Sequence, residues 1–155
     1  MSNTYQLKIY PDAVLRDKSF PVLNFDSRLF NLIEGMKEIM YLRQGIGLAA
    51  PQVGVLQRVV IADIGEGLFT LVNPVILHRQ GAEYLEEGCL SLPGVQVEIQ
   101  RSEIITVSGL TVKGKTVEME LSGLMARVIQ HEIDHLNGIL IIDYQWEPSK
   151  QVKEL

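Results

Sequence analysis

The chain has 155 residues, of which 46% are hydrophobic and 21% are charged, and its formal net charge is −5. This length and composition predict one globular domain, residues 1–155, with room for a hydrophobic core. The negative charge, without any Lys/Arg cluster, argues against nucleic acid or an anionic membrane as the main partner. With one cysteine, no apolar run of membrane-spanning length and no targeting segment, we expect a cytoplasmic protein.

The N-terminal part of the chain is predicted to contain one amphipathic helix. Residues 7–23 include two prolines and are expected to form an extended arm with turns. The helix begins after Asp26 or Ser27 as N-cap, and Gly45 is its predicted stop. Apolar residues recur between them at helical spacing and predict one buried face, formed by Leu29, Leu32, Ile33, Met36, Ile39 and Met40.

A glycine-rich segment, GIGLAAPQVG at residues 45–54, follows this helix. Its glycines permit unusual backbone angles and a close approach of a ligand to the main chain. The segment lacks the G-x-G-x-x-G spacing and does not follow a strand, which argues against a dinucleotide site. By itself it is equally consistent with a turn between a helix and a strand.

The remainder of the chain is dominated by predicted strands. A second helix, capped by Ser122, runs to about Leu136 and stops at Asn137-Gly138. Asn73-Pro74 is expected to mark a bend or a sheet edge. We therefore predict an α+β fold, with antiparallel sheets packed around this second helix and a further helix near the N-terminus. The predicted strands are 58–64, 68–77, 82–87, 95–100, 103–110 (joined to the next by a turn at 113–115), 116–121 and 139–142.

The second helix carries the motif H-E-x-x-H in residues 130–138, QHEIDHLNG. His131 and His135 are four residues apart, so both imidazoles lie on one face of the helix. Glu132 lies about 100° round the helix from His131 and can reach a water held between the rings. The arrangement can bind a divalent metal and supply a general base, although two histidines buried in an ordinary helix would show the same spacing.

A catalytic centre of this kind needs a third protein ligand. The metzincin proteases place a histidine where this chain has Ile141, and only twenty residues follow His135, which leaves little room for a glutamate on another helix. Two candidates remain: His78, in a strand-like run, and Cys89, the only cysteine, in EEGCLSLPG.

Three segments together resemble the peptide deformylase family: GIGLAAPQ at 45–52, EGCLS at 87–91 and QHEIDHLNG at 130–138. IYPDAVLR near the start, LVNPVI at 71–76 and DY at 143–144 extend the resemblance over nearly the whole chain. It implies hydrolysis of the N-formyl group of formyl-methionyl peptides and nascent chains. The metal ligands implied are Cys89, His131 and His135, the general base is Glu132, and the oxyanion donors are the Gln52 amide and the Leu90 backbone N–H. The resemblance also implies a divalent ion, Fe²⁺ by family preference, with Zn²⁺, Ni²⁺ and Co²⁺ as alternatives.

Two further expectations concern the surroundings of this site. The substrate peptide should lie as an added strand beside Ile46 and Gly47. Its methionine side chain needs an apolar pocket, for which we select Ile46, Val128 and Ile129. Asp134, flanked by apolar neighbours, is expected to pair with Arg101 and to join the segment bearing Cys89 to the helix.

The sequence departs from many relatives at two places. A basic residue common seven positions after the cysteine is replaced by Gln96, and the chain ends in EPSKQVKEL rather than a basic helix. We therefore do not expect ribosome docking through such a helix, and we expect the source to be bacterial-type or phage-encoded. The rival functions are an H-E-x-x-H metallopeptidase and an inactive binding homologue. A cytidine-deaminase-like site would need a second cysteine.

Overall fold

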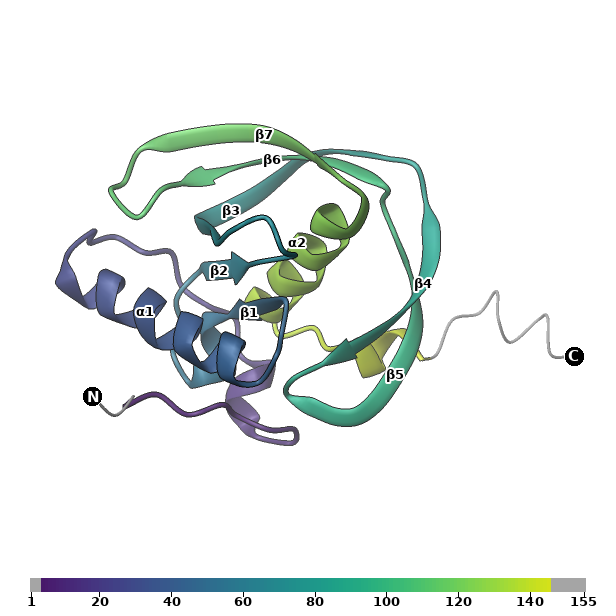
Figure 1. Cartoon of the computed structure of the whole chain (residues 1–155), viewed down its shortest axis with the longest axis horizontal. Coiled ribbons are helices and arrows are strands. Elements are labelled where there is room, and N and C mark those ends of the chain that lie inside the picture. The colour runs from purple at the N-terminus through teal and green to yellow at the C-terminus, as the bar shows by residue number, and fades with distance from the viewer. Residues whose placement is uncertain (1–3, 146–155) are drawn as a thin grey trace, which may run out of the picture.

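An antiparallel sheet of five strands crosses the molecule, and helix α2 (Gly123–Leu136) packs against it (Figure 1). In a computed structural model, residues 4–145 are described. Two further strands pair as a separate antiparallel hairpin, β4 (Glu83–Cys89) and β5 (Leu92–Arg101), on the other side of α2 from α1. The large sheet has the order β1 (Gly47–Ala49), β2 (Val59–Ala62), β3 (Phe69–Gln80), β6 (Ile104–Leu110) and β7 (Thr116–Ser122). The predicted α+β architecture is confirmed.

Helix α1 (Ser27–Leu42) forms where the sequence predicts it. Asp26 is the N-cap, and its side chain accepts a hydrogen bond from the Arg28 N–H at 3.0 Å. The predicted apolar face is buried and packs in one core with β1 and β2. The helix ends slightly earlier than predicted: Gln44, rather than Gly45, adopts the left-handed conformation with φ 58°, while the Gly45 N–H donates to the Met40 carbonyl.

Helix α2 is buried along most of its length, because β1, β2, β6 and β7 all pack against it. Its boundaries match the prediction, and Gly138 takes the left-handed turn (φ 73°) that ends it. Ser122 occupies the N-cap position, but its side chain makes no capping hydrogen bond. His131 and His135 on this helix are therefore held by packing on several sides.

Six predicted strands are present, with one irregularity at the predicted bend. The register of β3 with β6 shifts between Val72 and Val75, where Asn73 adopts φ 51°. The Asn73 side chain bonds both backbone groups of Val22, at 2.8 and 3.0 Å, and so fastens the N-terminal arm to the sheet.

The predicted final strand at 139–142 is wrong. Ile141–Tyr144 form a short 3-10 helix, η3, and Asp143 Oδ2 accepts from the Leu140 N–H at 2.9 Å. This side chain satisfies a backbone donor that a sheet partner would otherwise have satisfied.

The two lysines of the C-terminal segment EPSKQVKEL, Lys150 and Lys153, lie outside the described residues. No helix within residues 4–145 is both long and apolar enough to cross a membrane.

Candidate metal centre

The two histidines of α2 form one side of the candidate site. Their ring centroids are 5.1 Å apart, as expected for residues one turn apart on a single face. His131 directs Nδ1 at Glu87 Oε1, 2.9 Å away, which leaves Nε2 as its free ligand atom. Burial lowers the pKa of His135 well below its usual value, so this ring is neutral, as a metal ligand must be.

Cys89 completes the set from the β4–β5 hairpin. The hairpin register shifts between Glu87 and Cys89, and the Cys89 Sγ lies 3.3 Å from His135 Nε2. Within the described residues, the ligand atoms of Cys89, His131 and His135 all lie within 4.8 Å of one another. Thiolate and imidazole donors bound to one tetrahedral ion are roughly 3 to 4 Å apart. This donor set therefore fits a borderline-soft divalent metal. His78 is exposed on β3 and is not part of this group.

Glu132 lies beside the ligands and is almost entirely buried. Its Oε1 has no hydrogen-bond partner among the described residues, and its Oε2 faces Gly47, where an added Cβ would lie 2.5 Å from it. Burial raises the pKa of Glu132 to about 7, outweighing the nearby positive charges of His131 and Arg101. A carboxyl with a pKa near neutrality and a free oxygen is suited to exchange protons with a reacting group.

Glu87 is the residue of the site to which the sequence analysis assigned no role. Its carboxylate accepts from His131 Nδ1, from Arg101 Nε and Nη2, and from Arg127 Nη1, at distances between 2.6 and 3.0 Å. Burial alone would raise its pKa, but the bonds from His131 and Arg101 prevail and lower the pKa to about 2. In the sequence, only its position two residues before Cys89 could have indicated a role for Glu87 at the site. Its hydrogen-bond partners are distant in sequence, so no local pattern connects them.

Arg101 and Asp134 form an ion pair, with Arg101 Nη1 2.6 Å from Asp134 Oδ2. Tyr144 donates to the same oxygen at 2.6 Å, and the Arg101 guanidinium lies 5.1 Å from the centre of the Tyr144 ring. Burial and the bond to Asp134 raise the pKa of Tyr144 to about 12. Arg101 thus contacts both Glu87 and Asp134 and joins β5 to α2.

Gln52 lies in the short helix η2 (Ala50–Val53) with its amide oriented by two contacts. Oε1 accepts from the Ala49 N–H at 2.9 Å, while Nε2 donates to Ser91 Oγ at 3.1 Å and lies 3.7 Å from Cys89 Sγ. The amide NH₂ is therefore directed at the metal ligands. Leu90 is adjacent to Cys89 and lines the same cavity.

A cavity of about 470 Å³ opens beside these groups. Ile46, Gly47, Leu124 and Val128 contribute to its walls. Of the residues selected for the methionine pocket, Ile129 is misplaced: it is fully buried in the core between α2 and the sheet. It precedes His131 by two residues, which turns its side chain about 200° round the helix, away from the ligands.

The fold and the ligand set, with a glutamate beside them, are those of a metal-dependent hydrolase. Residues 4–151 match the polypeptide deformylase family, and the chain belongs to this family. A peptide deformylase of Halothermothrix orenii is 48% identical over 140 residues, covering 89% of this chain and 91% of that protein. The crystal structure of the Thermotoga maritima peptide deformylase is 49% identical with TM-score 0.89, covering 92% of this chain and 97% of that one. The crystal structure of the Synechococcus elongatus peptide deformylase in complex with actinonin is 39% identical with TM-score 0.90, covering 99% of this chain and 84% of that one.

Proposed function

We infer that the chain is a metallohydrolase that removes the N-formyl group from newly synthesised polypeptides beginning with formyl-methionine. The observation that carries this inference is the convergence of Cys89, His131 and His135 with Glu132 and the Gln52 amide at one cavity. Family membership favours this reaction over the two rivals, a metallopeptidase and an inactive binding homologue.

We assign the metal to the three ligands above, with Fe²⁺ as the ion favoured by the family resemblance and Zn²⁺, Ni²⁺ or Co²⁺ as substitutes. When bound, the ion supplies Lewis acidity toward the carbonyl and water oxygens. For His131, burial lowers the pKa, but Glu132, Cys89 and Glu87 outweigh burial and raise it to about 10. Loading of the site therefore releases a proton and is favoured at higher pH.

Glu132 acts as the general base and then as the general acid. It takes the proton of the attacking water and returns it to the departing amine, which a carboxyl with pKa near 7 does in both directions. The Gln52 amide and the Leu90 N–H stabilise the developing oxyanion. Removal of one such donor costs about 3–4 kcal/mol in comparable acyl-transfer sites.

The substrate lies along β1, because this strand is the edge of the large sheet that borders the cavity. The Ile46 carbonyl already bonds the Asp63 N–H at 2.9 Å, so strand addition would use the opposite side of the chain. The methionine side chain occupies the apolar part of the cavity, against Ile46 and Val128. Gly47 lets β1 lie close to Glu132 and Val128, because a methyl group in place of its hydrogen would collide with both side chains.

We place the reaction in the cytoplasm, on nascent chains, without nucleic acid or membrane as a partner.

Anaerobically purified protein, assayed for metal content and for formate release from formyl-Met-Ala, tests the proposed function. We expect one divalent ion per chain, rapid release of formate, and no cleavage of casein. Acetyl-Met-Ala is the matched control, because it differs by a single methyl group. Casein digestion without formate release would establish the metallopeptidase instead, and metal binding without either activity would establish the binding homologue.

A further inference from the structure

Arg127 is a buried arginine that lies one turn before His131 on α2. Within the described residues, none of its hydrogen bonds goes to one of the three metal ligands. Its Nη1 donates to Glu87 Oε2 at 2.6 Å and to the Ile99 carbonyl at 3.0 Å. Its Nη2 donates to the Glu83 carbonyl at 2.7 Å. One side chain of α2 therefore reaches both strands of the β4–β5 hairpin.

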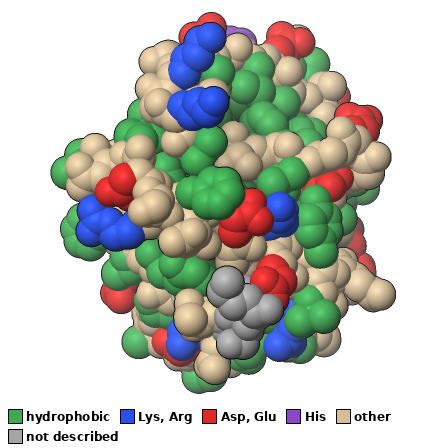
Figure 2. Space-filling view, turned by 60° about the vertical axis from the view of Figure 1, so that its left-hand side comes forward, with side chains coloured by type: hydrophobic (Ala, Val, Ile, Leu, Met, Phe, Trp, Pro, Cys, Tyr) green, Lys and Arg blue, Asp and Glu red, His purple; other side chains and the backbone are tan. Residues whose placement is uncertain are grey.

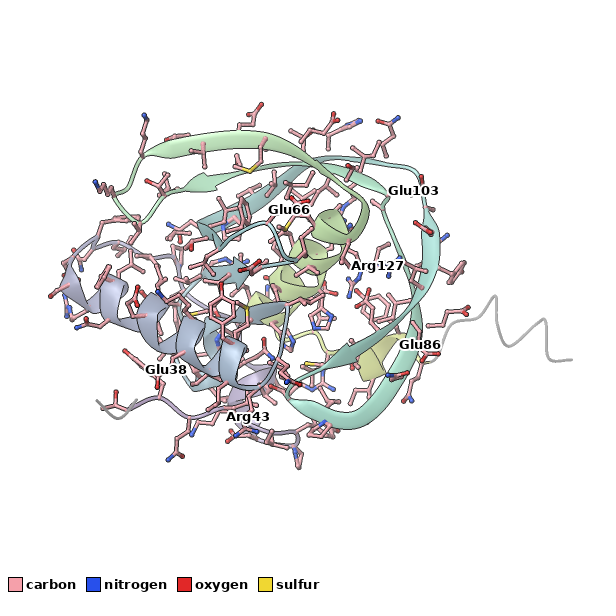
Figure 3. The ribbon with its side chains drawn as sticks, viewed as in Figure 1. Glu38, Arg43, Glu66, Glu86, Glu103 and Arg127 are labelled. Carbon is pink, nitrogen blue, oxygen red and sulfur yellow. The ribbon has the colours of Figure 1, made fainter. Side chains whose placement is uncertain are left out.

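The hairpin needs such a connection because its backbone does not pack closely on α2. Figure 3 shows Arg127 on the side of α2 that faces β4 and β5. Glu83 and Ile99 lie on opposite strands of the hairpin, at the end remote from Cys89, while Glu87 lies two residues before the cysteine. The contacts of Arg127 thus fix the hairpin to the helix that carries both histidines at two points, one near Cys89 and one further along the two strands.

When His131 is neutral, as a metal ligand must be, the charges around Glu87 balance only if Arg127 is counted. Two guanidinium groups, on Arg101 and Arg127, face two carboxylates, on Glu87 and Asp134. All four side chains are at least four-fifths buried. Without Arg127 the group would carry a net negative charge away from water, and Glu87 Oε2 would retain a single donor.

We propose that Arg127 is a positioning residue of the metal centre. It holds Glu87 in the orientation that receives His131 Nδ1, and it holds the cysteine-bearing hairpin at the distance from α2 that lets one ion bind all three ligands. Its effect on the metal is transmitted through Glu87. This inference rests on the metal site proposed above, whose occupancy in the wild-type protein is measured separately.

Arg58, which precedes β2, offers a matched control because it contacts the same helix from another part of the chain. It also donates to two backbone carbonyls, those of Ser19 and Leu136, at 3.2 and 3.1 Å, and so fastens the C-terminal end of α2. Its other hydrogen bond goes to the Asn137 side chain, and within residues 4–145 it makes none to Glu87. Arg58→Met removes a comparable clamp without touching the carboxylate beside His131.

The experiment loads wild type, Arg127→Met and Arg58→Met with Co²⁺ and measures the ligand-field spectrum and the rate of release to a chelator, far below each melting temperature. Outer partners of metal ligands typically change affinity by about 10- to 100-fold. We expect Arg127→Met to release Co²⁺ at least about tenfold faster with an altered spectrum, and Arg58→Met to match wild type in both. Equal release rates for the two variants would reduce Arg127 to a general stabiliser and overturn the proposal.

A cycle with Glu87→Gln tests whether the effect passes through Glu87. Arg127→Met should add little to the release rate in that background, whereas a fully multiplicative effect would contradict the assignment. Arg127→Lys serves if the methionine variant does not fold, because an ammonium cannot reach Glu87 and both carbonyls together. That variant should still release Co²⁺ faster than wild type, and an unchanged rate would also refute the proposal. Failure of wild type to bind Co²⁺ would count against the metal site itself.

Discussion

Substitution of Gly47 by alanine should inactivate the protein more than it destabilises it. A Cβ at this position would lie 2.5 Å from Glu132 Oε2 and 2.6 Å from Val128 Cγ1. Both distances are at least 0.8 Å shorter than ordinary van der Waals contact, which begins at 3.4 Å. Both residues lie on α2, but Val128 is a short β-branched side chain packed in the core, whereas the Glu132 carboxylate ends a longer side chain and moves more readily.

The two effects of this substitution have different expected sizes. Overpacking of a well-packed site costs about 1–3 kcal/mol of unfolding free energy. For a chain of this length that lowers the melting temperature by roughly 2–4 °C for each kcal/mol. A catalytic group displaced by about 1 Å loses on the order of 100-fold in rate. We therefore expect kcat to fall about 100-fold in a protein that still folds and retains its metal.

The assay is formate release from formyl-Met-Ala, with melting temperature and metal content measured on the same sample. Gly88→Ala is the control, because its added Cβ would meet nothing closer than the Val95 carbonyl at 3.8 Å. This control should retain its fold and its metal. A Gly47→Ala protein with wild-type kcat would refute the role of Glu132 as the proton carrier.

Four further experiments test the base, the cysteine, the Arg101–Asp134 pair and the metal. Glu132→Gln should keep the metal and lose most of the activity, since the ligands remain but the proton carrier is gone; wild-type turnover would reject the mechanism. Cys89→Ser should lower iron retention, measured by metal analysis, because a hydroxyl is a poor substitute for a thiolate. Arg101→Ala and Asp134→Ala should each destabilise the fold by about 3–5 kcal/mol by leaving a buried charge unpaired. The double variant should be no worse than Arg101→Ala alone, because that change already removes the bonds to both Asp134 and Glu87. Strictly additive losses would show that the two residues are uncoupled. Chelation of the metal should lower the melting temperature of wild type. Adding the ion back should raise the melting temperature with the logarithm of the free ion concentration.

Local patterns in the sequence were sufficient for most of the fold. Helix α2 could be predicted at both ends because its apolar spacing and the pair Asn137-Gly138 are read within a few residues. The segment at 139–142 was mispredicted because an apolar run of four residues suits a strand equally well. What decided against a strand is the Asp143 side chain, which bonds the Leu140 N–H.

The site was predictable where its geometry is local or its motif specific. The helical spacing places His131 and Glu132 near each other, whereas Cys89 was favoured through the family resemblance. Ile129 was wrongly selected because proximity in sequence was given more weight than direction round the helix. Arg127 carried no signal, since its three partners lie 28 to 44 residues away and become neighbours only when the hairpin folds over α2.

The order of the large sheet leaves it with two dissimilar edges, β1 and β7. An unpaired edge is a template for any extended chain, including another copy of the same protein. β7 exposes Glu118 and Glu120, and two copies paired along it would bring like charges together. The molecular surface in Figure 2 likewise intersperses acidic and basic side chains among its apolar ones. β1 has only three residues, too few to support a lasting association between folded copies. The architecture that we propose accepts a peptide strand at β1 thus discourages aggregation at β7.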